Sequence, residues 1–368
     1  MSINRKSIKE QITISDDTFL NRIECNIMRG IAILFIIVDN MIHFFNGVFM
    51  DNEYIYRWDS VQGFINNLIH PNTTLPFNLI SFYCPYGVML FIFLSGYCLT
   101  LKYEKGHGRG TSTKVFICNH YQKLFVMQLK GLALFLTAMF LLYPNRIVSN
   151  VNVFQFFLVG NLIPLWECLP GPYWFFGMLM EMYVIYRLII YNRNDWVAIA
   201  LTVFSIVAMA FLEPESSTLY YLRINCFLAI LPFCIGVLAA RHFKTNSFSL
   251  NKTSACWLWF LLAFALLTAS KFNFYSWLIM PVFIIITAVT LVKLFVKVKF
   301  FDTIFGWLGT MSGVLFVIHP IVREIMIERM NNTGHFYGML LIYLLITLGL
   351  CLILKPAFIS NNKNSKLR

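Results

Sequence analysis

Charged residues are scarce in this chain. Asp, Glu, Lys and Arg together make 12% of its 368 residues, whereas hydrophobic residues make 58%. A soluble domain of this size could not bury that much apolar surface, so the soluble classes are excluded. The scarcity of charge and the apolar excess predict a membrane protein.

Two further absences narrow the class. No unit of about 20–50 residues repeats along the chain, so nothing indicates a solenoid or a transporter built from inverted repeats. The nine cysteines are scattered and none belongs to a CxxC pair. We interpret them as small apolar packing residues and predict no metal site.

Hydrophobic runs recur along the chain at the length that crosses a bilayer. A helix of about 17–25 mostly apolar residues spans a hydrocarbon core of roughly 30 Å. Eleven runs are candidates, near 27–47, 78–101, 124–143, 151–169, 173–191, 196–212, 222–240, 255–270, 274–292, 304–322 and 338–358. We therefore expect an all-α polytopic membrane protein.

The distribution of Lys and Arg indicates which runs cross. Cytoplasmic loops are enriched in these residues, and most of the 29 in this chain fall on one side only if 151–169 does not cross. That run is interrupted by Gly160, Asn161 and Pro164, and broken backbone is tolerated at membrane depth only where protein or a wet cavity covers it. We predict ten transmembrane helices, both termini in the cytoplasm, and one re-entrant or interfacial segment at 151–169.

The same pattern predicts a single transmembrane domain. A polar cytoplasmic segment at 1–26, which lacks the apolar core of a signal peptide, precedes the domain at 27–360, and a basic cytoplasmic tail follows at 361–368. The net charge of +12 is explained by basic cytoplasmic loops and by attraction to anionic lipid. We therefore predict the lipid bilayer as a partner, and no nucleic acid.

Few ionisable residues remain inside the predicted spans, and they include Asp39, His43, Glu181 and His319. Such groups are costly at membrane depth and are usually functional. Asp39 and His43 are four residues apart and share a helix face, so the carboxylate can orient the imidazole as a general base. The alternative is a polar pair that joins two helices.

Glu181 and His319 each allow two interpretations. Glu181 either shares a proton with His43 or His319, or forms a protonated hydrogen bond between helices. His319 precedes Pro320, so its ring either joins that proton network or bonds a backbone carbonyl freed by the proline. The sequence leaves both alternatives open.

Four stretches of the chain together resemble one known family. They are MRGIAILFIIVDNMIHF at 28–44, GVMLFIFLSGYCL at 87–99, GPYWFFGMLMEMYVIY at 171–186 and GTMSGVLFVIHPIV at 309–322. They are similar, in the same order, to helices of acyltransferase family 3, a group of bacterial integral-membrane O-acyltransferases. The resemblance implies transfer of a short acyl group, usually acetyl, from acyl-coenzyme A (acetyl-CoA) as co-substrate, with no bound cofactor. The implied acceptor is a hydroxyl of an envelope glycan or glycolipid, and the implied location is the bacterial inner membrane.

The resemblance also implies a catalytic histidine eleven residues after the arginine of the first helix, which here is Arg29. That position holds Asn40, so we transfer the role of base to His43, one helical turn further on. Asn40 then becomes an orienting or oxyanion-binding amide. If the base must stand at position 40, the alternatives are Asp39 or an inactive chain.

The remaining candidates concern the two substrates. Arg29 and Lys123 are predicted to contact the phosphates of coenzyme A from the cytoplasmic side. Tyr173 and Trp174 either stack on the acceptor sugar or belong to the interfacial aromatic belt. The competing function is a secondary transporter or proton-coupled flippase, in which the buried ionisable residues would form a proton relay.

Overall fold

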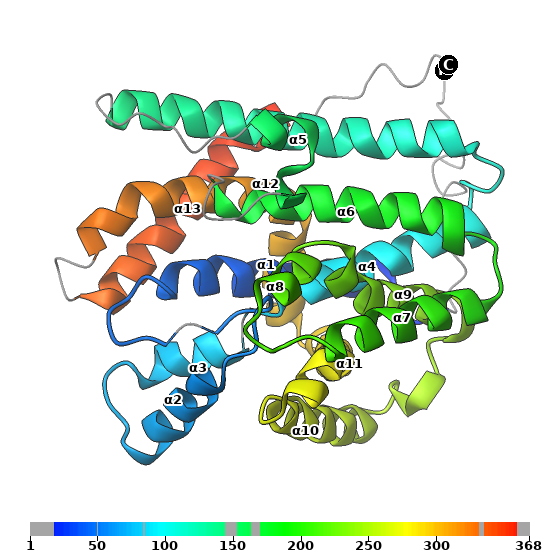
Figure 1. The fold of residues 1–368 in the computed structure, drawn as a ribbon, viewed down its shortest axis with the longest axis horizontal. Coiled ribbons are helices and arrows are strands. Elements are labelled where there is room, and N and C mark those ends of the chain that lie inside the picture. The colour runs from blue at the N-terminus through cyan, green and yellow to red at the C-terminus, as the bar shows by residue number, and fades with distance from the viewer. Residues whose placement is uncertain are drawn as a thin grey trace.

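The computed structural model describes residues 18–49, 51–83, 85–143, 153–162, 170–330 and 335–358. Across these ranges the chain is helical and contains no β-strand, so the predicted all-α class is confirmed. Figure 1 shows α5 and α6 above α1 and α4, with α10 at the opposite edge of the bundle. Most of the segment 1–26 and the whole basic tail at 361–368 lie outside the described residues.

The α-helices have the following bounds: α1 Arg22–Ile42, α2 Trp58–Ile69, α3 Leu75–Tyr83, α4 Gly87–Thr100, α5 Thr113–Leu142, α6 Trp174–Ile185, α7 Asp195–Ala210, α8 Ser217–Arg223, α9 Cys226–His242, α10 Thr253–Ser270, α11 Phe274–Phe295, α12 Lys299–Met330 and α13 Phe336–Phe358. Two π-helical turns extend α4 and α6, namely η1 Leu101–Lys105 and η6 Tyr186–Ile190. Short 3-10 turns are η2 Val153–Phe157, η3 Gly160–Leu162, η5 Gly171–Tyr173 and η7 Ser247–Ser249.

Membrane-length helices dominate the described part of the chain. Nine helical stretches there are long and apolar enough to cross a membrane, and Asp195–Ala210 is a shorter apolar helix. A polytopic membrane protein is therefore confirmed, whereas the count of ten crossings stays a prediction. The segment predicted not to cross contains only η2 and η3 over its described part, and residues 163–169 lie outside the described residues.

The first helix begins and ends earlier than the sequence predicted, at 22–42 instead of 27–47. It begins with a capping box, in which Asn21 accepts from the Glu24 amide at 3.0 Å and Glu24 accepts from the Asn21 amide at 2.9 Å. It ends at Ile42, so His43 caps the helix rather than lying within it. From His43 the chain enters an irregular segment that leads to α2 at Trp58, which we call the 43–57 segment.

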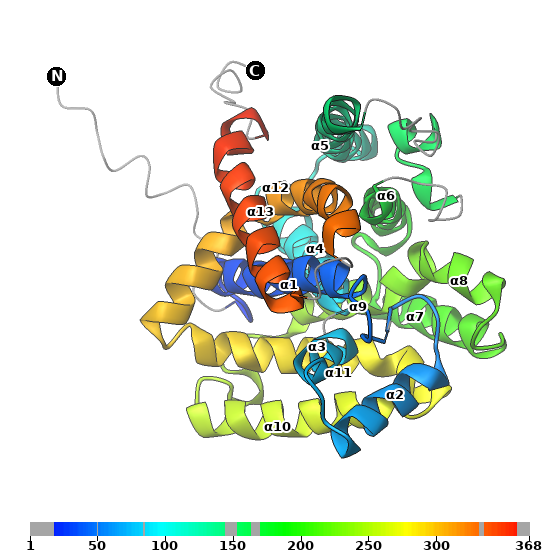
Figure 2. The ribbon, with the colours of Figure 1, turned by 90° about the vertical axis from the view of Figure 1, so that its left-hand side faces the viewer.

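α1 lies near the centre of the bundle, with α4, α11 and α12 packed around it (Figure 2). Glycine permits the closest of these approaches. A Cβ at Gly30 would lie 2.0 Å from the Phe305 carbonyl oxygen of α12, and a Cβ at Gly309 of α12 would lie 1.9 Å from a carbonyl oxygen of α1. Small residues that bring helix backbones together are the usual device of membrane bundles, where apolar lipid offers no hydrophobic drive to associate.

Two buried cations anchor the 43–57 segment to the bundle. Lys271, between α10 and α11, forms a buried ion pair with Asp51. The Nε of Arg223 in α8 donates to the Glu53 carbonyl oxygen at 2.5 Å, and its guanidinium lies 3.9 Å from the Trp277 ring centroid. The segment is thereby fixed over one end of the bundle, although it has no regular secondary structure.

The helix ends permit a direct test of topology. Gly171 precedes α6, and a side chain there would meet open space; Ser247 lies between α9 and α10. We expect Gly171→Cys to react with a membrane-impermeant thiol reagent in intact cells, and Ser247→Cys to react only after permeabilisation, each in a background without exposed cysteine. Labelling of Ser247→Cys from outside would mean that 151–169 crosses the membrane.

Candidate active site

Two cavities lie within the bundle, and the same two phenylalanines line both. One cavity, of about 380 Å³, is rich in basic residues, and we call it the basic cavity. The other, of about 180 Å³, is lined in part by Asn40, and we call it the Asn40 cavity. Phe175 of α6 and Phe316 of α12 line each of them, and their ring centroids are 5.1 Å apart. These two rings therefore form a partition between the cavities.

Four basic side chains from three segments line the basic cavity. They are Arg29 of α1, Lys102 of η1, and His120 and Lys123 of α5. Arg29 donates to Asn26 at 3.0 Å and contacts the Cys98 sulfur at 3.6 Å. The structure thus brings Arg29 and Lys123 together, as the sequence predicted. We call this end of the bundle the basic side.

The Asn40 cavity combines an amide, a guanidinium, a carboxyl and an indole. Arg323 of α12 donates to Asn40 Oδ1 at 3.1 Å and to Glu324 at 2.5 Å. Asn40 in turn donates to the Ile36 carbonyl oxygen at 2.9 Å. The Nε of Arg323 has no hydrogen-bond partner among the described residues. Asn40 therefore positions the guanidinium, and the described residues leave the N–H at Nε unpaired.

Only one of the two predicted aromatic residues lines a cavity. Trp174 lines the Asn40 cavity and meets Tyr54 of the 43–57 segment edge to face, with ring centroids 5.3 Å apart. Tyr173 is buried, and its hydroxyl donates to the Val317 carbonyl oxygen at 2.9 Å. Tyr173 thus joins η5 to α12, whereas Trp174 offers a ring to the cavity.

Asp39 and His43 come together as predicted, although their geometry is not that of an oriented base. His43 Nε2 lies 3.3 Å from Asp39 Oδ1, but that oxygen has no hydrogen-bond partner among the described residues. The hydrogen bond of His43 Nε2 is to Ser81 at 3.1 Å, and Ser81 itself donates to the Phe49 carbonyl oxygen at 2.8 Å. Ser81 therefore accepts from Nε2. Neither residue of the pair is among those that line the two cavities.

Glu181 forms hydrogen bonds with main-chain and amide groups rather than with a histidine. Asn161 of η3 donates to Glu181 Oε1 at 2.5 Å, and the Cys226 amide at the start of α9 donates to Oε2 at 2.8 Å. Both His43 and His319 have other partners, so the expectation that Glu181 shares a proton with them finds no contact among the described residues. Glu181 instead fastens η3 to the start of α9.

His319 bonds a backbone carbonyl oxygen, as its second interpretation expects, but it is that of Leu315. The carbonyl that Pro320 frees is that of Phe316, four residues before the proline. His319 is fully buried, and its Nδ1 lies 3.1 Å from the Leu315 carbonyl oxygen, one turn back along α12. This bond lies in the turn that precedes Pro320, where the proline removes a main-chain donor. Tyr343 of α13 donates to the His319 carbonyl oxygen at 3.3 Å. We therefore assign His319 to the packing of α12 against α13.

Glu53 and Arg323, which both line the Asn40 cavity, were not among the site residues predicted from the sequence. Glu53 is only 6% exposed. Its burial raises the pKa of the carboxyl to about 7, with a further rise from Asp51 and an opposing effect from Arg223. No sequence pattern indicated Glu53, because it lies in an irregular segment; Arg323, in contrast, lies four residues after His319 on the same helix face.

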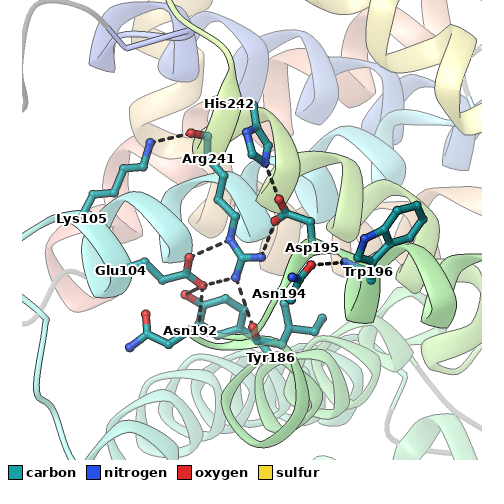
Figure 3. A network of polar contacts seen from close by, with 10 residues as sticks. Glu104, Lys105, Tyr186, Asn192, Asn194, Asp195, Trp196, Arg241 and His242 are labelled. Carbon is teal, nitrogen blue, oxygen red and sulfur yellow. Dashed lines mark hydrogen bonds and ion pairs between the residues drawn. The ribbon is translucent and has the colours of Figure 1, made fainter.

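A network of charged residues joins three helix ends on the basic side (Figure 3). Arg241 of α9 donates to Glu104 of η1 and to Asp195 of α7, each at 2.8 Å. Asp195 also bonds His242 at 2.6 Å, and Lys105 donates to the Arg241 carbonyl oxygen at 2.9 Å. Because carboxylates engage Arg241, this network stabilises the helix ends.

The comparisons with known proteins give one family. The family model described as an acyltransferase domain, that of acyltransferase family 3, matches residues 22–355. No curated protein and no solved structure matches the chain. The matched residues include the described helices α1 to α12, both cavities and the partition between them. The chain therefore belongs to acyltransferase family 3 and is an acyltransferase of the membrane.

Proposed function

We propose that this chain transfers an acyl group, namely acetyl, from acyl-coenzyme A to a hydroxyl of an envelope sugar or lipid-linked saccharide. The observation that carries the proposal is the pair of cavities that share Phe175 and Phe316. One cavity suits an anionic donor and the other a polar acceptor. The thioester and the acceptor hydroxyl would meet at these two rings.

The basic cavity fits the donor. Coenzyme A carries phosphates, and Arg binds phosphate with paired donors while Lys acts as a point charge. Arg29, Lys102 and Lys123 supply both kinds of group within one cavity. In the proposed topology both termini and this basic side face the cytoplasm, where acyl-coenzyme A is made, and the protein resides in the bacterial inner membrane.

The Asn40 cavity fits the acceptor and the reacting carbonyl. Trp174 offers an indole face of the kind that stacks on a sugar, and Arg323 offers a charged donor to the oxygen of the tetrahedral intermediate. The acceptor oxygen attacks the thioester carbonyl carbon, a base takes the hydroxyl proton, and the carbon–sulfur bond breaks to release coenzyme A. The sequence predicted His43, paired with Asp39, as that base, but neither residue lines either cavity.

An assay with labelled acetyl-coenzyme A distinguishes an acyltransferase from a transporter. The purified protein is reconstituted into vesicles with a glycan or glycolipid fraction of a bacterial envelope and given acetyl-coenzyme A labelled in the acetyl group. An acyltransferase releases free coenzyme A and yields a labelled ester that hydroxylamine cleaves. A secondary transporter or proton-coupled flippase yields neither product, and that result would reject the proposal.

Arg29→Lys tests the donor site. We expect the Michaelis constant for acetyl-coenzyme A to rise about ten- to a hundred-fold, because a hydrogen bond to a charged group contributes about 1.5–3 kcal/mol. The turnover number should change less, and the Michaelis constant for the acceptor should not change. Arg22→Lys is the matched control, since Arg22 is exposed at the start of the same helix. Parent kinetics in Arg29→Lys would mean that Arg29 only reaches toward the lipid headgroups.

A further inference from the structure

Among the described residues that line the Asn40 cavity, Glu53 is the one with a carboxyl group. The backbone around this carboxyl is fixed from two sides, because Arg223 binds the Glu53 carbonyl oxygen and Lys271 pairs with Asp51. The Nε of Arg223 thus bonds the main chain rather than the Glu53 carboxylate. The carboxyl is therefore held at the cavity by an anchored loop.

The other candidates for a base are less well placed. Asn40, at the position where the family resemblance implies histidine, carries an amide that cannot take a proton at neutral pH. His43 forms its hydrogen bond with Ser81 at 3.1 Å and is not among the residues that line either cavity. The acceptor would enter a space that Glu53 lines and that neither Asp39 nor His43 lines.

We propose that Glu53 is the general base of the reaction. The inference rests on the proposed acyl transfer and deepens it. The acceptor hydroxyl gives its proton to the Glu53 carboxylate as its oxygen bonds to the thioester carbonyl carbon. Arg323 stabilises the oxyanion that results. The intermediate then collapses, the carbon–sulfur bond breaks, and the thiolate of coenzyme A leaves with the electron pair and takes up a proton, which Glu53 can return.

The electrostatic surroundings of Glu53 suit this role. Burial and the neighbouring Asp51 raise its pKa to about 7, and Tyr54 and Arg223 oppose the rise. A base whose pKa lies near the working pH combines a populated carboxylate with a strong pull on the proton. The charged and titratable groups that face it are Asp39 of α1, Asp51 and Tyr54 of the 43–57 segment, Arg223 of α8 and Arg323 of α12.

The first experiment measures acyl transfer by Glu53→Gln and Glu53→Asp. Positioned acid–base catalysis contributes about 100- to 10,000-fold, so Glu53→Gln should lower the turnover number by that factor with an unchanged Michaelis constant for acetyl-coenzyme A. Glu53→Asp should recover part of the rate. Asp59→Asn, which removes an exposed carboxylate of α2, should behave like the parent. The thermal unfolding temperature of each purified variant is compared with that of the parent. An unchanged temperature indicates loss of the base alone, whereas a lower one indicates a displaced loop.

The pH profile gives a second measurement. The active form is the carboxylate, so the rate of the parent should rise with pH and level off above about 7, with a tenfold fall per pH unit below that value. The residual rate of Glu53→Gln should lack this rise. His43→Ala should keep the rise, whatever its effect on the rate. If His43→Ala removes the rise and Glu53→Gln keeps it, His43 is the base and the assignment of Glu53 is overturned.

An infrared titration measures the protonation of the Glu53 carboxyl without any acyl transfer. The parent should show a protonated carboxyl band that disappears as the pH rises through about 7, and Glu53→Gln should lack that band. If the parent yields no ester at all, the proposed function fails, and this titration alone then decides whether Glu53 accepts a proton at neutral pH. A parent that makes the ester but shows no such band would overturn the role of Glu53 while leaving acyl transfer intact.

Discussion

Arg323→Lys should lower the turnover number for acyl transfer by about 100- to 1000-fold, the usual effect of removing one donor to a developing oxyanion. Arg323 is held by Asn40 at 3.1 Å and by Glu324 at 2.5 Å, and its remaining Nε donor has no partner among the described residues. Lysine keeps the positive charge but cannot reproduce the planar set of donors. The measurement is single-turnover transfer from labelled acetyl-coenzyme A.

Two comparisons make this result specific. Arg57→Lys changes an exposed arginine at the end of the 43–57 segment and should leave the rate unchanged. Asn40→Ala removes the group that positions Arg323 and should lower the rate by a smaller factor than Arg323→Lys. Near-parent turnover in Arg323→Lys, with normal thermal stability, would exclude the guanidinium from the reaction and leave it a partner of Glu324.

The second large effect concerns the length of the acyl chain. Phe175 and Phe316 separate the two cavities, are each buried, and lie 5.1 Å apart between ring centroids. The acyl group of a bound donor would have to fit beside these rings. Phe316→Leu opens space there while keeping an apolar side chain, so the preference for acetyl- over propionyl-coenzyme A should fall by about 10- to 200-fold, the discrimination that one methylene commonly provides in an apolar pocket.

Phe176→Leu is the matched control for the partition. Phe176 follows Phe175 in α6 and also contacts Phe316, at 5.6 Å between ring centroids, but it lines only the basic cavity. Its substitution removes the same volume next to the partition and should leave the acetyl preference in place. An equal loss of preference in both variants would mean that general loosening of the helix packing, rather than the partition, sets the chain length.

The sequence alone determined the class of this protein and the grouping of Arg29 with Lys123. Hydropathy and the positions of Lys and Arg are local properties, and a bilayer imposes a length and a sidedness on them. The all-α polytopic fold and the placing of Arg29 with Lys123 followed from those properties. The predicted bounds of α1 were nevertheless wrong by five residues at each end. The capping box at Asn21 begins the helix before the apolar run begins.

Tertiary structure alone decided which polar side chains share the Asn40 cavity. Asn40 meets Arg323 across 283 positions of the chain, and Glu53 reaches the cavity because Arg223 and Lys271 anchor the 43–57 segment. Helical periodicity predicts neighbours three or four residues apart, such as Asp39 and His43. It predicts neither how an irregular segment folds nor which face of a distant helix it meets. Helical periodicity therefore predicted that Asp39 neighbours His43, whereas the packing of α1, α6, α12 and the 43–57 segment brought Glu53, Asn40, Trp174 and Arg323 to one cavity.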